Sequence, residues 1–153
     1  MYEPFLLIHS WTRWAVILVA LYLLIRFAYG WMRKSEWRES LDQFAWAFSQ
    51  LLTLQVLFGL MLFLGTSPLV KVGLSNPSLI MTDPVIGFWT VRHPITMITA
   101  LGAFHVGKSI ARRSPTELRF KRYALALAIA LALIATAIPW PWLPFGRPLI
   151  YGF

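Results

Sequence analysis

Three histidines and one arginine lie in apolar stretches of this chain, where ionisable side chains are rare. His9 and Arg13 lie in "FLLIHSWTRWAVILVALYLLIRFAYG", while His93 and His105 share a second apolar stretch. Neutral imidazoles are ligands of haem iron and other metals, and arginine pairs with carboxylates and phosphates. Ionisable groups inside membrane segments usually face the protein interior and mark functional sites. These four residues are therefore the first candidates for chemistry.

Counting along the predicted helices indicates that His9 and His93 lie at similar depths. At ~1.5 Å per residue, His9 lies about 7 Å into its helix and His93 about 10 Å into its own. Arg13 is about one turn deeper than His9, and Gln55 lies roughly at the depth of Arg13 on a helix of opposite direction. Two imidazoles at matched depth on different helices favour bis-histidine ligation of a haem iron. We therefore expect His9 and His93 to be metal ligands, with Gln55 beside the cofactor.

His105 is expected to lie apart from this pair. It is about 18 Å further along the helix than His93, and its ring points about 120° away, so one small ligand cannot contact both rings. It is a candidate for a separate cofactor contact or for a hydrogen bond near the helix end.

Haem propionates need cationic partners, for which Arg13, Arg92 and Lys71 are candidates. Small side chains that would leave room for a macrocycle are Gly59, Ala100, Gly102, Ala103 and Gly107.

The composition is that of an integral membrane protein. The chain has 153 residues, of which 58% are hydrophobic and 13% charged, with a mean hydropathy of +0.64. Soluble proteins carry about 25% charged residues. The net charge of +8 does not indicate nucleic-acid binding, because the basic residues flank apolar helices. The absence of cysteine excludes disulfides, thiolate metal sites and covalent haem attachment.

Four apolar segments predict an all-α, up-down four-helix transmembrane bundle that forms one domain over residues 1–153. The segments cover roughly 4–29, 44–64, 85–110 and 120–138, each near the ~20 residues needed to cross a bilayer. We expect residues 65–84 to form an outer loop, with a short amphipathic turn near 69–74, because Pro, Ser, Asn and Asp interrupt it. Pro139 and Pro141 are expected to end the fourth helix. The opening "MYEPF" is expected to start a mature helix and not a signal peptide.

The distribution of basic residues predicts the orientation. Ten of the 14 lysines and arginines lie within 26–38 and 108–122, the two regions around the first and third connections. Basic loops stay in the cytoplasm, so both termini are expected on the outer, periplasmic side.

No H-E-x-x-H, phosphate-binding glycine loop or G-x-S-x-G motif occurs in the sequence. An electron carrier or redox-complex subunit is therefore expected over a stand-alone enzyme.

Four short motifs carry a family resemblance. "HSWTRW", "RHPITM", "HVGKS" and "IPWPW" resemble small bacterial four-helix membrane proteins of the cytochrome-b-like type, along essentially the whole chain. The resemblance implies a bacterial inner-membrane protein with histidine-ligated haem b and a role in electron transfer. His9, His93 and His105 match the histidines of the family pattern. Relatives can carry a further histidine near "LTLQ", where this chain has Thr53, so His105 lacks an axial partner and one haem is expected over two.

Two other functions remain open from the sequence. The polar residues could form a hydrogen-bond network that sets the helix register of a cofactor-free accessory or scaffold subunit. Alternatively, Arg13, Gln55 and a histidine could bind a quinone or a lipid. The partners expected across these cases are membrane lipids, other membrane redox subunits or further copies of the chain, and a quinone in the last case. No nucleic-acid partner is expected.

Overall fold

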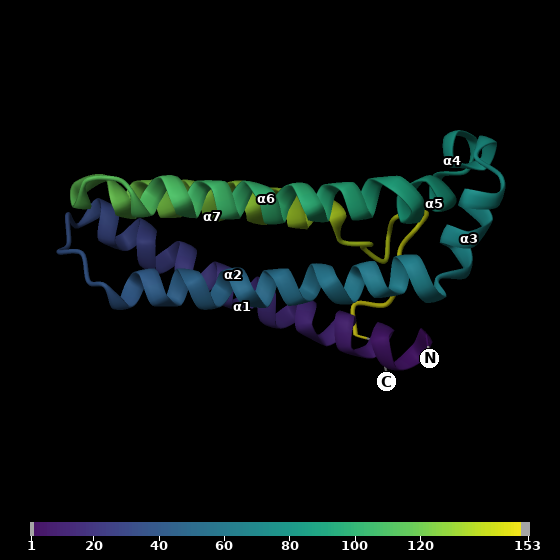
Figure 1. The fold of residues 1–153 in the computed structure, drawn as a ribbon, viewed down its shortest axis with the longest axis horizontal. Helices are drawn as coiled ribbons and strands as arrows, with labels where there is room; N and C mark the ends of the chain where they lie inside the picture. Colours follow the sequence, from purple (N-terminus) through teal and green to yellow (C-terminus); the bar gives the residue numbers. More distant parts are fainter. Residues whose placement is uncertain (1, 151–153) are drawn as a thin grey trace.

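The computed structural model describes residues 2–150, and every regular element in that range is helical (Figure 1). Two of the elements, η1 and η2, are π-helical turns that continue a neighbouring α-helix. The elements are α1 (Tyr2–Met32), α2 (Ser40–Met61), η1 (Leu62–Thr66), α3 (Pro68–Ser75), α4 (Ser78–Thr82), α5 (Pro84–Gly87), η2 (Phe88–Arg92), α6 (His93–Arg112) and α7 (Thr116–Ala137).

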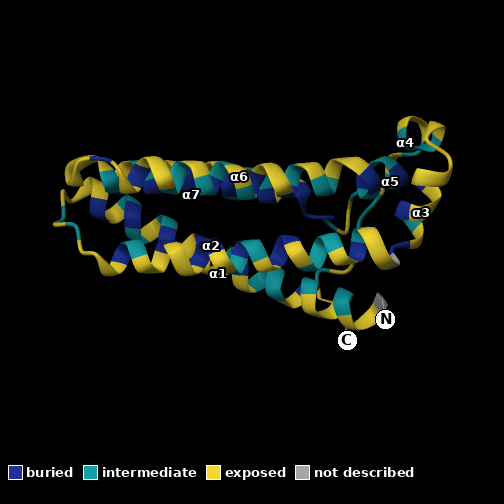
Figure 2. Cartoon of the chain, viewed as in Figure 1, coloured by how far each residue is buried: buried dark blue, intermediate teal, exposed yellow. Residues whose placement is uncertain are grey.

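Four long helices pack around one core. α1 packs against α2 and α7, and α6 packs against the same two helices, so each long helix has two long neighbours. In Figure 1, α6 and α7 run together along one side of the molecule, and α3, α4 and α5 lie at one end. Buried residues lie on the helix faces that point between the long helices (Figure 2). α7 contributes small side chains to this core, which allows close helix contact: Ala124, Ala126, Ala130 and Ala137.

Within residues 2–150, three helices are long and apolar enough to cross a membrane. They cover Glu3–Met32, Ser40–Gly65 and Thr116–Ala137. Their outward faces carry large apolar side chains, including Leu18 and Ile25 of α1, which are 65% and 68% exposed. Exposed apolar surface of this kind is suited to contact with lipid. α6 differs from these helices, because it contains both His93 and His105 and ends in basic residues.

The observed helix ends depart from the predicted bounds in one important region. Residues 65–84, expected as a loop with a short turn near 69–74, contain the two short helices α3 and α4, and α3 covers the expected turn. Proline starts helices here, because its missing N–H is harmless in a first turn. Ser67 caps α3 ahead of Pro68, and the Asp83 carboxylate accepts hydrogen bonds from the first N–H groups of α5 at 2.8 and 3.0 Å.

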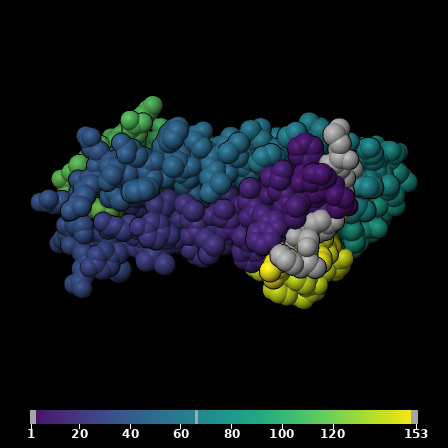
Figure 3. Space-filling model, turned by 90° about the horizontal axis from the view of Figure 1, so that it is seen from below, coloured from purple at the N-terminus to yellow at the C-terminus, as the bar shows by residue number. Residues whose placement is uncertain are grey.

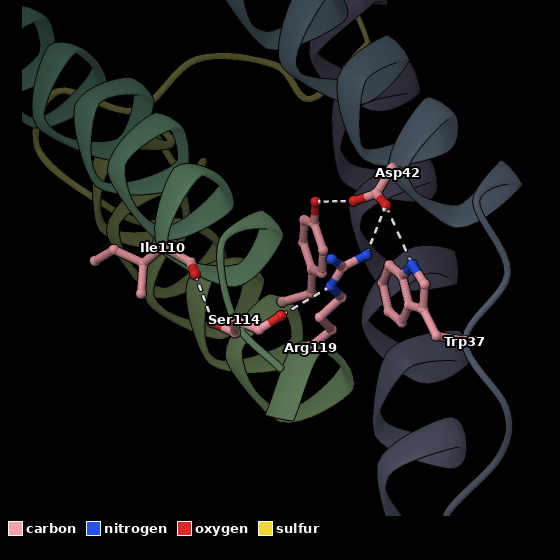
Figure 4. A network of polar contacts seen from close by, with 6 residues as sticks. Trp37, Asp42, Ile110, Ser114 and Arg119 are labelled. Carbon is pink, nitrogen blue, oxygen red and sulfur yellow. Dashed lines mark hydrogen bonds and ion pairs between the residues drawn. The ribbon is translucent and has the colours of Figure 1, made fainter. Parts of the chain in front are cut away.

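Asp42 joins α2 to α7 near the two connections that carry most of the basic residues, and Figure 4 shows its polar contacts. Its carboxylate accepts hydrogen bonds from the Tyr123 hydroxyl at 2.5 Å and the Trp37 indole N–H at 3.1 Å, and forms an ion pair with Arg119 at 3.5 Å. The Trp37 and Tyr123 rings are stacked with centroids 5.4 Å apart, and Phe27 stacks on both of them. This network fixes α2 and α7 relative to one another far from the histidine pair.

Candidate functional site

His9 of α1 and His93 of α6 face each other. Their ring centroids are 6.2 Å apart and their ring planes are inclined at 77°. Both side chains are half-buried, and both line the same cavity. The depth estimate made from helix geometry therefore predicts the pairing that the structure has. The pair lies near the end of the bundle opposite to the Asp42 network.

His93 is oriented by the end of α7. Its Nδ1 lies 2.8 Å from the carbonyl oxygen of Ala137, the last residue of that helix. In the neutral ring this nitrogen donates its proton to the carbonyl, which leaves Nε2 as the nitrogen with a free lone pair. Phe88 and Trp89 lie against the ring at centroid distances of 5.7 and 5.4 Å. They belong to the π-helical turn η2, a feature that often occurs at functional sites.

His9 is held against α2 through Gln55. The Gln55 amide donates to the backbone oxygen of His9 at 3.0 Å, and its nitrogen lies 3.5 Å from the His9 Nε2. The Thr12 hydroxyl, one turn along α1, is hydrogen-bonded to the Gln55 side-chain oxygen. His9 Nδ1 is buried and has no hydrogen-bond partner in the described residues. An unpaired buried polar atom is costly, so this nitrogen is suited to interact with a bound group.

Gly59 leaves the space that the His9 ring occupies. A Cβ placed on Gly59 would lie 3.1 Å from Cε1 of His9, which is closer than ordinary van der Waals contact. The other two glycines named from the sequence have different roles. A Cβ at Gly102 would meet nothing within 4 Å, and one at Gly107 would lie 2.5 Å from the Cβ of Ala126. Gly107 therefore serves the packing of α6 against α7 and not the histidine site.

Residues 138–150 follow α7, and we call them the C-terminal strap. The strap covers the histidine site. Its Leu149 carbonyl oxygen accepts hydrogen bonds from Nη2 of Arg13 at 2.5 Å and from the indole N–H of Trp14 at 2.9 Å. Its Phe145 ring stacks on Phe88 at a centroid distance of 3.7 Å. Figure 3 shows the strap, in yellow, against the N-terminal part of α1. The strap thus connects α1 to the aromatic side chains that contact His93.

The cavity enclosed by these elements has a volume of about 110 Å³. Arg13 and Arg147 contribute cationic groups to its wall, and none of its lining residues within 2–150 is acidic. Nε of Arg13 is buried without a hydrogen-bond partner in the described residues. The remaining wall is mostly apolar, and includes Val56, Leu60, Phe63, Met97 and Ile134. The site therefore combines two imidazoles, an amide and two guanidinium groups in an apolar surrounding.

The other predicted site residues lie outside this cavity. Arg92 is exposed, with its guanidinium carbon 5.6 Å from the Phe145 ring centre, and neither it nor Lys71 lines the cavity. His105 lies on the same helix as His93 but its Nε2 is 3.4 Å from the Thr53 hydroxyl of α2. One turn further, Lys108 donates to the Ser49 hydroxyl at 2.7 Å. His105 therefore belongs to a separate polar contact between α2 and α6.

Sequence reasoning missed four participants in the site. Ala137 and Leu149 take part through backbone carbonyls, which have no sequence signature. Thr12 could have been found, because it precedes Arg13 by one residue and faces Gln55. Arg147 was counted only as an outer basic residue, although its guanidinium lies over the Trp89 ring at 4.4 Å and lines the cavity. Its place between Gly146 and Pro148 in a proline-rich segment gave no sign of that position.

Within residues 2–150, no group of three or more His, Cys, Asp or Glu side chains comes together in a way that could hold a metal ion. Comparison with protein-family models, with curated proteins and with solved structures finds no match to this chain.

Proposed function

We propose that the protein crosses the bacterial inner membrane four times, with both termini on the outer side and the Asp42 network on the cytoplasmic side. Three helices have the length and composition of membrane spans. α6 packs against two of them, α2 and α7, and its helical run begins at α5 and η2. Most basic residues lie at the end of the molecule that this orientation puts in the cytoplasm.

Within that bundle, we propose that the protein binds one haem b between His9 and His93 and transfers electrons. The separation of the two rings is the observation that carries the proposal. A metal–imidazole bond is about 2 Å long, so two imidazoles on opposite sides of one iron have centroids about 6 Å apart. The observed centroid distance is 6.2 Å.

The side chains around the pair fit such a group. The Ala137 carbonyl orients His93 in the way that outer hydrogen bonds orient metal-bound histidines. Gly59 leaves room for the His9 ring, and an apolar wall excludes water. The cavity of about 110 Å³ is smaller than the ~300 Å³ of ordinary ligand pockets. A macrocycle therefore enters only when an element of the wall, such as the strap, moves outward.

The ligand set favours electron transfer. A haem held by both His9 and His93 would leave no position open for a substrate and would supply single-electron transfer. The roles of the chain are to supply both imidazoles from helices fixed by packing, to leave one ring nitrogen of each free to bind the group, and to exclude water. No acidic side chain lines the site within the described residues, so general acid–base chemistry by a carboxylate is not supported.

Purified protein, expressed with haem available, tests this proposal through a pyridine haemochrome assay and an absorption spectrum. We expect one haem b per chain and a low-spin spectrum. A preparation without a Soret band would overturn the proposal. In that case mass spectrometry of extracted small molecules distinguishes a quinone or lipid site, which would retain a bound molecule, from a scaffold subunit, which would retain none beyond bulk lipid.

A further inference from the structure

The cavity contains two guanidinium groups, and their arrangement indicates what kind of group a ligand must present to them. We propose that Arg13 and Arg147 form a carboxylate-binding subsite beside the histidine pair, and that the Leu149 carbonyl of the strap occupies it until a ligand carboxylate takes its place. This inference rests on the proposed function, in which the ligand is haem and the carboxylates are its propionates.

The hydrogen bonding of Arg13 carries the argument. Nη2 and Nε share one edge of the guanidinium, the edge that binds both oxygens of a carboxylate side-on. Nη2 donates to the Leu149 carbonyl oxygen at 2.5 Å, whereas Nε is buried without a partner in the described residues. The single carbonyl oxygen thus accepts from only one of the two N–H donors on this edge. A carboxylate in the same place would satisfy both donors and would supply the missing negative charge.

The position of Arg13 makes a neutral partner insufficient. The residue lies in a helix with the properties of a membrane span, where an unneutralised charge is expensive. None of the cavity's lining residues within 2–150 is an aspartate or glutamate. A hydrogen bond to a carbonyl oxygen does not offset the charge, while a carboxylate does so and forms the stronger, charge-assisted hydrogen bonds.

Arg147 adds a second cation at the same site. Its guanidinium carbon lies 4.4 Å from the ring centre of Trp89, whose ring in turn lies 5.4 Å from the His93 ring. Arg13, Arg147 and His93 all line the same cavity. Because Arg147 and Leu149 are both in the strap, movement of the strap that releases Arg13 also repositions Arg147. Two cations beside one pair of imidazoles match the two propionates of one haem.

Reconstitution of haem-free protein with haem and with haem dimethyl ester tests the subsite. Both compounds offer the same iron, but the ester has no carboxylate. Titration followed at the Soret band gives a dissociation constant for each. For the unmodified chain we expect haem to bind at least about tenfold more tightly than the ester, the effect of one charge-assisted hydrogen bond. Equal affinities would overturn the subsite and leave the haem proposal intact, whereas binding of neither compound would overturn the haem proposal.

Substitutions assign the preference to residues. We expect Arg13→Leu and Arg147→Leu each to weaken haem binding while leaving ester binding nearly unchanged, with Arg92→Leu as the matched control that changes neither. An equal loss of affinity for both compounds in the Arg13 variant would show a structural role and contradict the proposal.

Phosphate analysis of co-purified lipid tests whether Arg13 binds a lipid phosphate in place of a carboxylate. Loss of bound phospholipid in Arg13→Leu without any haem-over-ester preference would assign Arg13 to a lipid phosphate and overturn the proposal. If Arg13→Leu fails to fold, the comparison of haem with its ester on the unmodified chain decides alone.

Discussion

Nδ1 of His93 lies 2.8 Å from the carbonyl oxygen of Ala137, so the histidine that opens α6 is bound to the last residue of α7. This contact fixes the ring of His93 through the backbone of a neighbouring helix and not through another side chain. A backbone carbonyl cannot be removed by a single substitution, so the orientation of His93 depends on where α7 ends. Pro139 and Pro141 set that end.

Substitution of the paired histidines should remove the bound haem. His9→Ala and His93→Ala each remove one of the two imidazoles that would hold the haem, and we expect haem content to fall below a tenth of that of the unmodified protein. His105→Ala is the matched control and should retain its haem, because His105 contacts Thr53 outside the cavity. Haem content per chain after purification measures all three. A colourless His105→Ala protein would contradict the assignment of the ligand pair.

Gly59→Ala should weaken haem binding without unfolding the bundle. The added Cβ would lie 3.1 Å from Cε1 of His9 and would displace that ring by a few tenths of an ångström. Overpacking of this kind typically costs about 1–3 kcal/mol, so we expect affinity to fall by about tenfold or more. Gly102→Ala is the matched control, because its Cβ would meet nothing within 4 Å. The two variants are compared by titration at the Soret band; equal affinities would contradict the proposed dependence of binding on the position of the His9 ring.

Gly107→Ala should instead destabilise the fold. Its Cβ would lie 2.5 Å from the Cβ of Ala126, on the closely packed interface between α6 and α7. The helices would have to separate, at a cost of about 1–3 kcal/mol. Thermal unfolding in detergent, followed by circular dichroism, should show a lower midpoint for this variant than for Gly102→Ala. An unchanged midpoint would mean that the two helices are not so closely packed in the folded protein.

Tyr123→Phe should also lower stability, through the Asp42 network. The variant removes a hydrogen bond to a carboxylate, of a kind that contributes about 1.5–3 kcal/mol, and leaves Trp37 and Arg119 in place. Tyr22→Phe is the matched control, because Tyr22 is 63% exposed. Both variants should keep their haem, since the network lies at the opposite end of the bundle. Loss of haem in Tyr123→Phe would show coupling between the two ends that the contacts do not predict.

Labelling of single cysteines tests the orientation in the membrane. The chain has no cysteine, so Glu36→Cys and Ser78→Cys each introduce one thiol at an exposed position. A membrane-impermeant maleimide added to intact spheroplasts should label Ser78→Cys and not Glu36→Cys, and permeabilisation should expose both. Labelling of Glu36→Cys in intact spheroplasts would reverse the proposed orientation.

The sequence predicts most of the fold and the pairing at the site, because both depend on regular helix geometry. A constant rise per residue was enough to place His9 and His93 at one depth and Gln55 near them. The rest depends on contacts that residue types do not encode. The partners of His93 and Arg13 are the carbonyl oxygens of Ala137 and Leu149, which any residue could supply. Within 65–84, the sequence predicts the turn where α3 lies but not α4, because Pro, Ser and Asn usually interrupt helices, although Pro77 lies at the N-cap of α4.

The strap has a consequence for the order of folding. Ala137 lies 44 residues after His93, and Leu149 lies 136 residues after Arg13, so both carbonyls are distant in sequence from the side chains that they hold. Contacts of large sequence separation require the closure of a long loop, which is costly in entropy. We therefore expect α1, α2 and α6 to pack before the strap docks onto α1, and the wall beside Arg13 to be the last part of the site to form.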